Sequence, residues 1–137
     1  MTTTAHTSGH AIVNGVSLYH EIHGTGEPLV LLHGGLMTIP ELAPLLEPLA
    51  SNRQVIAVEL QGHGRSPDTD RPLRMESMAD DVAAFMAHLG VGAADVVGYS
   101  LGGDVALRTA IQHPDRVRRL VLLSTPFARS GWYPEVL

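Results

Sequence analysis

Gly98-Tyr99-Ser100-Leu101-Gly102-Gly103 is the most informative segment of this 137-residue chain for its fold. It follows a short apolar run, residues 95–99, and precedes a segment of helical periodicity, residues 101–113. A serine flanked by glycines at such a junction predicts a tight turn, because bulky side chains at positions 98 and 102 would collide with the strand and helix that meet there. We therefore expect a strand, a sharp turn at Ser100 and a helix.

Three more apolar runs on either side of this segment have the pattern of strands covered on both faces of a parallel sheet. They lie at residues 28–32, 55–58 and 119–123. Helical spacing recurs between them, in a segment at 42–49 interrupted by two prolines and in a segment from Ser77 to Leu89 that ends at Gly90. In the helix at 101–113 we expect Val105, Ala106, Ala110 and Ile111 to face inward. Alternating strands and helices predict an α/β fold, a parallel sheet flanked by helices on both faces.

The N-terminal region has a different pattern. Asn14-Gly15 favours a two-residue hairpin turn between the runs 11–13 and 16–22. We expect an N-terminal β-hairpin after a mobile polar tail at residues 1–9, a core at residues 10–125, and a separate C-terminal segment at residues 126–137. The length fits one domain.

Composition narrows the function classes. Hydrophobic residues make up 45% of the chain and charged residues 17%, as in a packed globular domain. A net charge of -5 with dispersed arginines argues against a nucleic-acid partner. The chain has no cysteine, no membrane-length apolar run and no secretory signal pattern at its start, so we expect no membrane association and a cytoplasmic location.

Ser100 is the candidate nucleophile. The turn would present its hydroxyl at the carboxyl edge of the sheet, and the following helix would point its N-terminus toward charge that develops there. The backbone N–H of Leu101 is then one donor to an oxyanion. A second glycine turn, Leu31-Leu32-His33-Gly34-Gly35-Leu36, ends a central strand and exposes further N–H groups. The competing interpretation is a glycine-serine-glycine turn selected for tightness alone.

Three motifs in order carry a family resemblance: the His33-Gly34-Gly35 turn, the loop Gly62-His63-Gly64-Arg65-Ser66, and the turn at Ser100. Together they resemble the α/β-hydrolase superfamily, and most closely its cap-bearing bacterial serine esterases. The resemblance implies that Gly35 or Leu36 gives the second oxyanion N–H. It also implies that His33, Gly34, Tyr99 and His63 support the loops or line the pocket. Glu59 departs from the aspartate that many relatives carry there, which we expect to affect loop support more than chemistry.

The same resemblance implies a catalytic acid and histidine that arrive later in the chain order. We therefore expect this chain to be the N-terminal half of the fold, with residues 126–137 starting the cap. Its last strand would be an exposed edge that invites homo-oligomers or another association. Either the sequence is a fragment, or the chain pairs with a polypeptide that supplies the later strands.

The expected function is hydrolysis of a small-molecule carboxylic ester, thioester or lactone through an acyl-enzyme on Ser100, with little activity from these residues alone. A serine at this turn argues against the dehalogenase and epoxide-hydrolase branches, which use an aspartate. A C–C bond hydrolase or a cofactor-free perhydrolase would keep the same motifs. We expect no cofactor and no metal site, because the eight histidines show no ligand spacing such as H-E-x-x-H. The alternative is a non-catalytic binding or assembly module that uses its sheet edge.

Overall fold

The computed structural model describes residues 6–136 and contains one six-stranded sheet. The strands are β1 (His6–Val13), β2 (Val16–His23), β3 (Pro28–Leu32), β4 (Gln54–Val58), β5 (Ala94–Tyr99) and β6 (Val117–Leu123). The helices are α1 (Ala43–Ala50), α2 (Met75–His88) and α3 (Leu101–Gln112), and short 3-10 turns lie at Ile39–Leu42, Arg129–Gly131 and Pro134–Val136.

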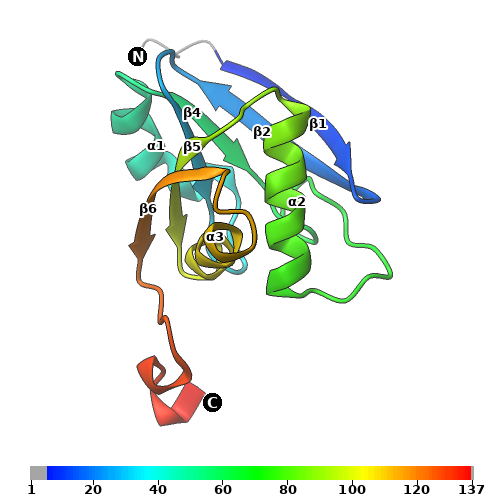
Figure 1. Ribbon diagram of the computed structural model, residues 1–137, viewed down its shortest axis with the longest axis vertical. Helices are drawn as coiled ribbons and strands as arrows, with labels where there is room; N and C mark the ends of the chain where they lie inside the picture. The colour runs from blue at the N-terminus through cyan, green and yellow to red at the C-terminus, as the bar shows by residue number, and fades with distance from the viewer. Residues whose placement is uncertain (1–5, 137) are drawn as a thin grey trace.

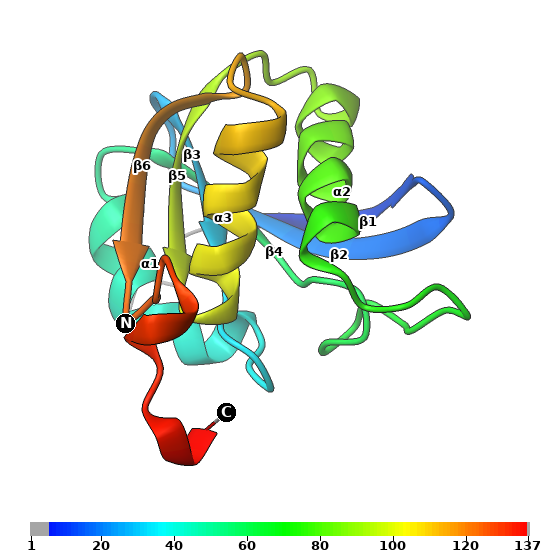
Figure 2. The same ribbon diagram turned by 60° about the horizontal axis from the view of Figure 1, so that its bottom comes forward.

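The strand order is β1-β2-β4-β3-β5-β6. Strands β3 to β6 pair in parallel, and the β1–β2 hairpin joins them antiparallel through β2 and β4. Helix α1 covers one face of the sheet, while α2 and α3 cover the other (Figures 1 and 2). The predicted α/β class, with helices on both faces and an N-terminal hairpin, is therefore confirmed.

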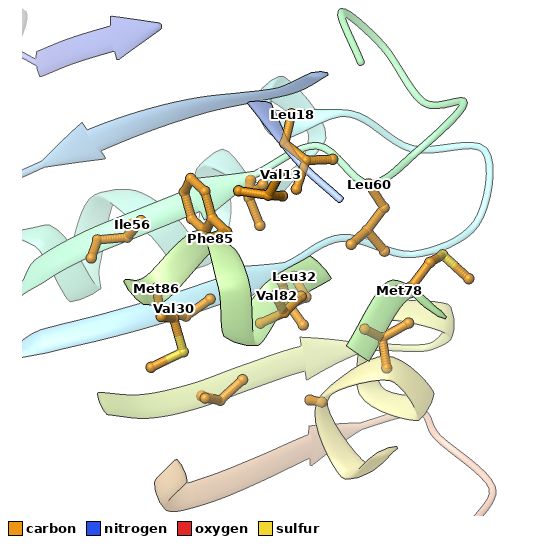
Figure 3. Packing of buried hydrophobic residues seen from close by; sticks show 14 of the residues in the cluster. Val13, Leu18, Val30, Leu32, Ile56, Leu60, Met78, Val82, Phe85 and Met86 are labelled. Carbon is orange, nitrogen blue, oxygen red and sulfur yellow. The ribbon is translucent and has the colours of Figure 1, made fainter. Parts of the chain in front are cut away.

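Two apolar clusters fix these layers. The larger lies between the sheet and the pair α2 and α3, with Phe85 and Met86 of α2 against Val30, Leu32 and Ile56 of the central strands (Figure 3). The smaller lies under α1, where Leu46 packs with buried residues of β3, β4 and β5. Strands β3 and β4 are covered on both faces, which accounts for their nearly continuous apolar sequences.

Two expectations about local structure were wrong. The hairpin begins at His6, so residues 6–9 belong to a strand: backbone pairing from His6 opposite His23 extends the ladder into polar sequence that has no apolar alternation. Residues 1–5 of the expected tail lie outside the described residues. Ile111 is 62% exposed, because it follows the buried Thr109 by about 200° around the helix.

The proline-interrupted segment forms a 3-10 turn and then α1, in which Pro44 stands in the first turn and Pro48 lies inside the helix. An early proline suits a helix because the first N–H groups have no intrahelical acceptor. Within the described residues, no helix has the length and apolar character needed to cross a membrane.

Candidate active site

Ser100 occupies the turn between β5 and α3 with φ 50° and ψ −117°. A residue with a side chain rarely adopts positive φ, so the surrounding structure must hold it there. Its N–H donates to the carbonyl of Leu123 at 2.9 Å, and its own carbonyl accepts from the N–H groups of Gly103 and Asp104 at 2.8 and 3.0 Å. Ser100 is thus fixed between the last strand and the first turn of α3, and remains partly exposed.

The flanking glycines are required by close backbone approach. A Cβ at Gly98 would strike the backbone of Gly102 and Gly103, and a Cβ at Gly102 would strike the carbonyls of Leu32 and His33. Helix α3 therefore starts directly against the end of β3. This contact is the physical reason for the glycine spacing from which the turn was predicted.

The two turns with candidate oxyanion donors lie next to each other. A Cβ on Gly35 would come within 3.8 Å of the Leu101 side chain. Leu36 has a φ of 61° and is fully exposed. The roles of Leu101, Gly35 and Leu36 as oxyanion donors remain predictions, but the structure brings the residues together at one edge of the sheet.

Tyr99 and Gly34 connect these turns. A Cβ on Gly34 would lie 2.9 Å from both the Tyr99 ring and the Met37 sulfur, so a larger residue would displace at least one of these two side chains. The Tyr99 ring therefore packs against the turn after β3 at Gly34. The pattern alone placed both residues near the pocket without giving this contact.

His33 is completely buried and both its ring nitrogens are occupied. Nδ1 donates to the carbonyl of Gly34 at 2.7 Å, and Nε2 accepts from the N–H of Leu60 at 2.9 Å. Burial lowers the pKa of His33, and the nearby His63 ring, 4.8 Å away between centroids, acts in the same direction. Nδ1 of His63 donates to the carbonyl of Gln61 at 3.0 Å. His33 is a neutral loop brace in this arrangement.

Glu59 ties two loops together from a fully buried position. Its carboxylate accepts from the N–H of Ile39 at 3.2 Å, the N–H of Arg65 at 2.6 Å and Nη2 of Arg65 at 2.9 Å. Burial opposes ionisation, but the hydrogen bonds from Arg65 and Ile39 outweigh it and lower the pKa of Glu59. A Cβ on Gly64 would strike this carboxylate.

Two residues near Ser100 were missed by the sequence interpretation. Thr125, just after β6, donates from its hydroxyl to the carbonyl of Ser100 at 3.2 Å. Asp104 stands one turn along α3 in a partly buried position, and burial raises the pKa of its carboxyl group. Neither residue belongs to a sequence motif. A helical wheel could have indicated Asp104, because residues 100 and 104 lie one turn apart on the same side of the helix.

None of the hydrogen bonds found among residues 6–136 involves the Ser100 hydroxyl. A serine hydroxyl is a weak nucleophile unless a base accepts its proton. The arrangement by itself therefore offers a hydroxyl on a partly exposed residue, nearby backbone N–H groups and no base bound to the hydroxyl.

The family model for the alpha/beta hydrolase fold matches residues 27–133. The chain is 36% identical over 124 residues to a soluble epoxide hydrolase of Corynebacterium, covering 88% of this chain and 42% of that protein. It is 38% identical over 120 residues to a pimeloyl-[acyl-carrier protein] methyl ester esterase of Nitrosomonas europaea, covering 86% and 46%.

Solved structures give the same result. A structure described as an N-acyl homoserine lactone degrading enzyme superposes with a TM-score of 0.84 at 33% identity, covering 93% of this chain and 49% of that one. The chain thus spans less than half the length of these relatives. With the family model matched over most of the sequence and the fold in agreement, the chain belongs to the α/β-hydrolase family.

Proposed function

We propose that Ser100 is the nucleophile of a serine hydrolase that acts on a carboxylic ester, thioester or lactone. The observation that carries this proposal is the strained backbone of Ser100 at the carboxyl end of β5, directly before the N-terminus of α3. Maintaining a serine at positive φ costs free energy of order 1–3 kcal/mol. A turn selected only for tightness would avoid that cost with glycine.

In the proposed reaction, Oγ of Ser100 attacks the carbonyl carbon while a base takes the hydroxyl proton. The carbonyl oxygen becomes an oxyanion that the N–H groups of Leu101 and of Gly35 or Leu36 would bind. The alcohol or thiol then leaves with a proton, and the acyl group remains on Ser100. Water attacks this ester in turn and releases the acid.

The chemical class rests on the nucleophile and on the relatives. Names among the matched proteins include a methyl ester esterase and a lactone-degrading enzyme, and an ester and a lactone both contain an acyl carbon that a serine can attack. Another relative is named an epoxide hydrolase. The serine at position 100 argues against that activity for this chain, because the resemblance implies an aspartate there in the epoxide-hydrolase branch.

Neither histidine near the carboxyl edge of the sheet is hydrogen-bonded to Ser100 in the described residues. His33 uses both ring nitrogens for backbone hydrogen bonds, and His63 donates through Nδ1 to the carbonyl of Gln61. We therefore propose that a histidine and a carboxylate on later strands or on another chain complete the triad.

A second candidate is a non-catalytic module that pairs through its sheet edge. The observation in its favour is β6, which ends the strand order and pairs only with β5 among the described strands, with Val121 47% exposed. In such a module Ser100 would be part of the scaffold. The two candidates differ in whether Ser100 becomes acylated.

The test is rapid-quench mass spectrometry with p-nitrophenyl acetate, on a form of the protein continued by an acid- and histidine-bearing second half. We expect one acetyl group on Ser100 and none in Ser100→Ala. Ser124→Ala is the matched control, since Ser124 also has positive φ, 52°, and is exposed at the same sheet edge. Acetylation that is unchanged in Ser100→Ala would contradict the proposal.

A further inference from the structure

We propose that the open end of the β1–β2 hairpin is a binding site for a divalent transition-metal ion of the zinc class, with His6, Glu21 and His23 as ligands. The hairpin lies at the opposite end of the strand order from β6. The site is separate from Ser100 and independent of the proposed hydrolase function.

Strand pairing brings the three side chains together. His6 lies directly opposite His23 in the antiparallel register, and Glu21 precedes His23 by two residues on the same face of β2. The two imidazole rings stack with their centroids 4.5 Å apart and their planes at 16°. Both rings have Nε2 within 4 Å of the same oxygen of the Glu21 carboxylate.

The ligand atoms are close to the spacing of a metal site. Nε2 of His23 lies 2.7 Å and Nε2 of His6 lies 3.9 Å from the same oxygen, Oε2 of Glu21, and one ligand atom from each residue falls within 4.8 Å of the others. Around tetrahedral zinc, with bonds of about 2.1 Å, ligand atoms are about 3.4 Å apart. To enclose an ion, the His23–Glu21 pair must move apart and the His6 ring must rotate toward Glu21.

The Glu21 carboxylate is oriented by its other oxygen. Oε1 accepts from the Tyr19 hydroxyl at 3.1 Å and lies 3.4 Å from Nη1 of Arg65, which leaves Oε2 directed toward the histidines. Such outer contacts fix the geometry of metal ligands. The positive charge of Arg65 is shared with Glu59, since its Nη2 lies 2.9 Å from Oε1 of that residue.

The donor set suits zinc or a similar ion. Neutral imidazole and carboxylate are ligands for Zn²⁺, Cu²⁺ and Ni²⁺. Binding requires both histidines to be neutral with the proton on Nδ1, so the Nε2 proton that His23 now shares with Glu21 must be given up. The His6 side chain is 39% exposed, so solvent reaches this cluster and water is available as a further ligand.

The sequence pattern does not reveal this site. Motif searches look for ligands one helical turn apart, whereas here one ligand comes from β1 and two from alternate positions of β2. From the sequence we expect no metal site, yet the pairing of β1 with β2 gathers these three residues, and the His23 side chain is only 13% exposed. Its partners become visible only when the register is known.

The test is a titration of the full chain with zinc, measured by calorimetry and, separately, by competition with a chromogenic chelator. We expect one equivalent to bind, and His6→Ala, His23→Ala and Glu21→Gln each to weaken that binding about tenfold or more. His6→Ala is decisive, because His6 is exposed at the start of a strand and its loss leaves the core intact. Zinc should also slow amide exchange in the first residues of β1, since the ion would link β1 to β2.

The matched control is His113→Ala. His113 also places Nε2 at 2.8 Å from a carboxylate, that of Asp80, but this pair belongs to no group of three possible ligands among residues 6–136. We expect it to leave the zinc affinity unchanged. Equal affinity in the parent chain and His6→Ala, or equal weakening by His113→Ala, would overturn the proposal and indicate unspecific histidine–carboxylate binding.

Discussion

The N–H of Leu60 donates to Nε2 of His33 over 2.9 Å, and this hydrogen bond joins the end of β4 to the turn that follows β3. The opposite nitrogen of the same ring donates to Gly34. A histidine placed at the carboxyl edge near a candidate nucleophile would ordinarily be considered as its base. Here the ring has no free nitrogen, so it holds the loop that carries Gly35.

His33 should make stability depend on pH. Its pKa is lowered in the folded state, so between that value and the unfolded value of about 6.5 the unfolded chain binds more protons. The stabilisation is present above pH 6.5 and is lost as pH falls through the folded pKa. In urea denaturation, the advantage of the parent chain over His33→Gln should therefore shrink from pH 7.5 to pH 5.

The exposed His88 provides the control, because His88→Gln should change stability little at either pH. His33→Ala should be worse than His33→Gln and cost about 2 kcal/mol or more at pH 7.5, since the buried N–H of Leu60 then loses its acceptor. A difference that grows toward pH 5 would contradict a neutral His33.

The 137-residue chain alone should show no Ser100-dependent turnover of a p-nitrophenyl ester above that of Ser100→Ala. Surface imidazoles cleave activated esters slowly, so the comparison with the variant matters more than the raw rate. An excess of about a hundredfold, as expected for a positioned base, would show that a histidine within the chain serves as that base. His33→Gln and His63→Gln, measured separately, would then identify it.

The strand-and-helix order and the position of Ser100 were predictable because each rests on local pattern. Val96 and Val97 before the turn and Gly102 after it specify a buried strand, a close approach and a helix start. The extent of β1 was not predictable, because its first residues pair through backbone groups and their side chains carry no apolar alternation. The hydrogen bonds from Ile39 and Arg65 to the Glu59 carboxylate were not predictable either, because the fold brings Ile39 to Glu59 from 20 residues away in the chain.

Gly98→Ala should destabilise the chain and displace Ser100. The added methyl group meets the backbone of Gly102 and Gly103, which is unable to yield without moving α3. We expect a loss of about 1–3 kcal/mol in urea denaturation, the range for overpacked sites. Gly92→Ala is the control, since nothing lies within 4 Å of its Cβ position and its φ is not positive; equal effects of the two substitutions would argue against the contact.

The edge formed by β6 should make the isolated chain self-associate at micromolar concentration. Val121→Lys places a charge on that edge and should increase the monomer fraction in light scattering. Ile111→Lys, which charges an exposed apolar residue of α3 instead, should have a smaller effect. A sharp monomer peak for the unmodified chain in light scattering would contradict self-association through the β6 edge.

Labelling with a fluorophosphonate probe, followed by peptide mass spectrometry, tests directly whether Ser100 is the nucleophile in a form of the protein continued by an acid- and histidine-bearing second half. The probe reacts with a serine only when that serine is activated as a nucleophile. We predict modification of Ser100 alone, its complete loss in Ser100→Ala, and its retention in Ser124→Ala. Labelling that persists in Ser100→Ala, or that occurs at another serine, would contradict the assignment of Ser100 as the nucleophile.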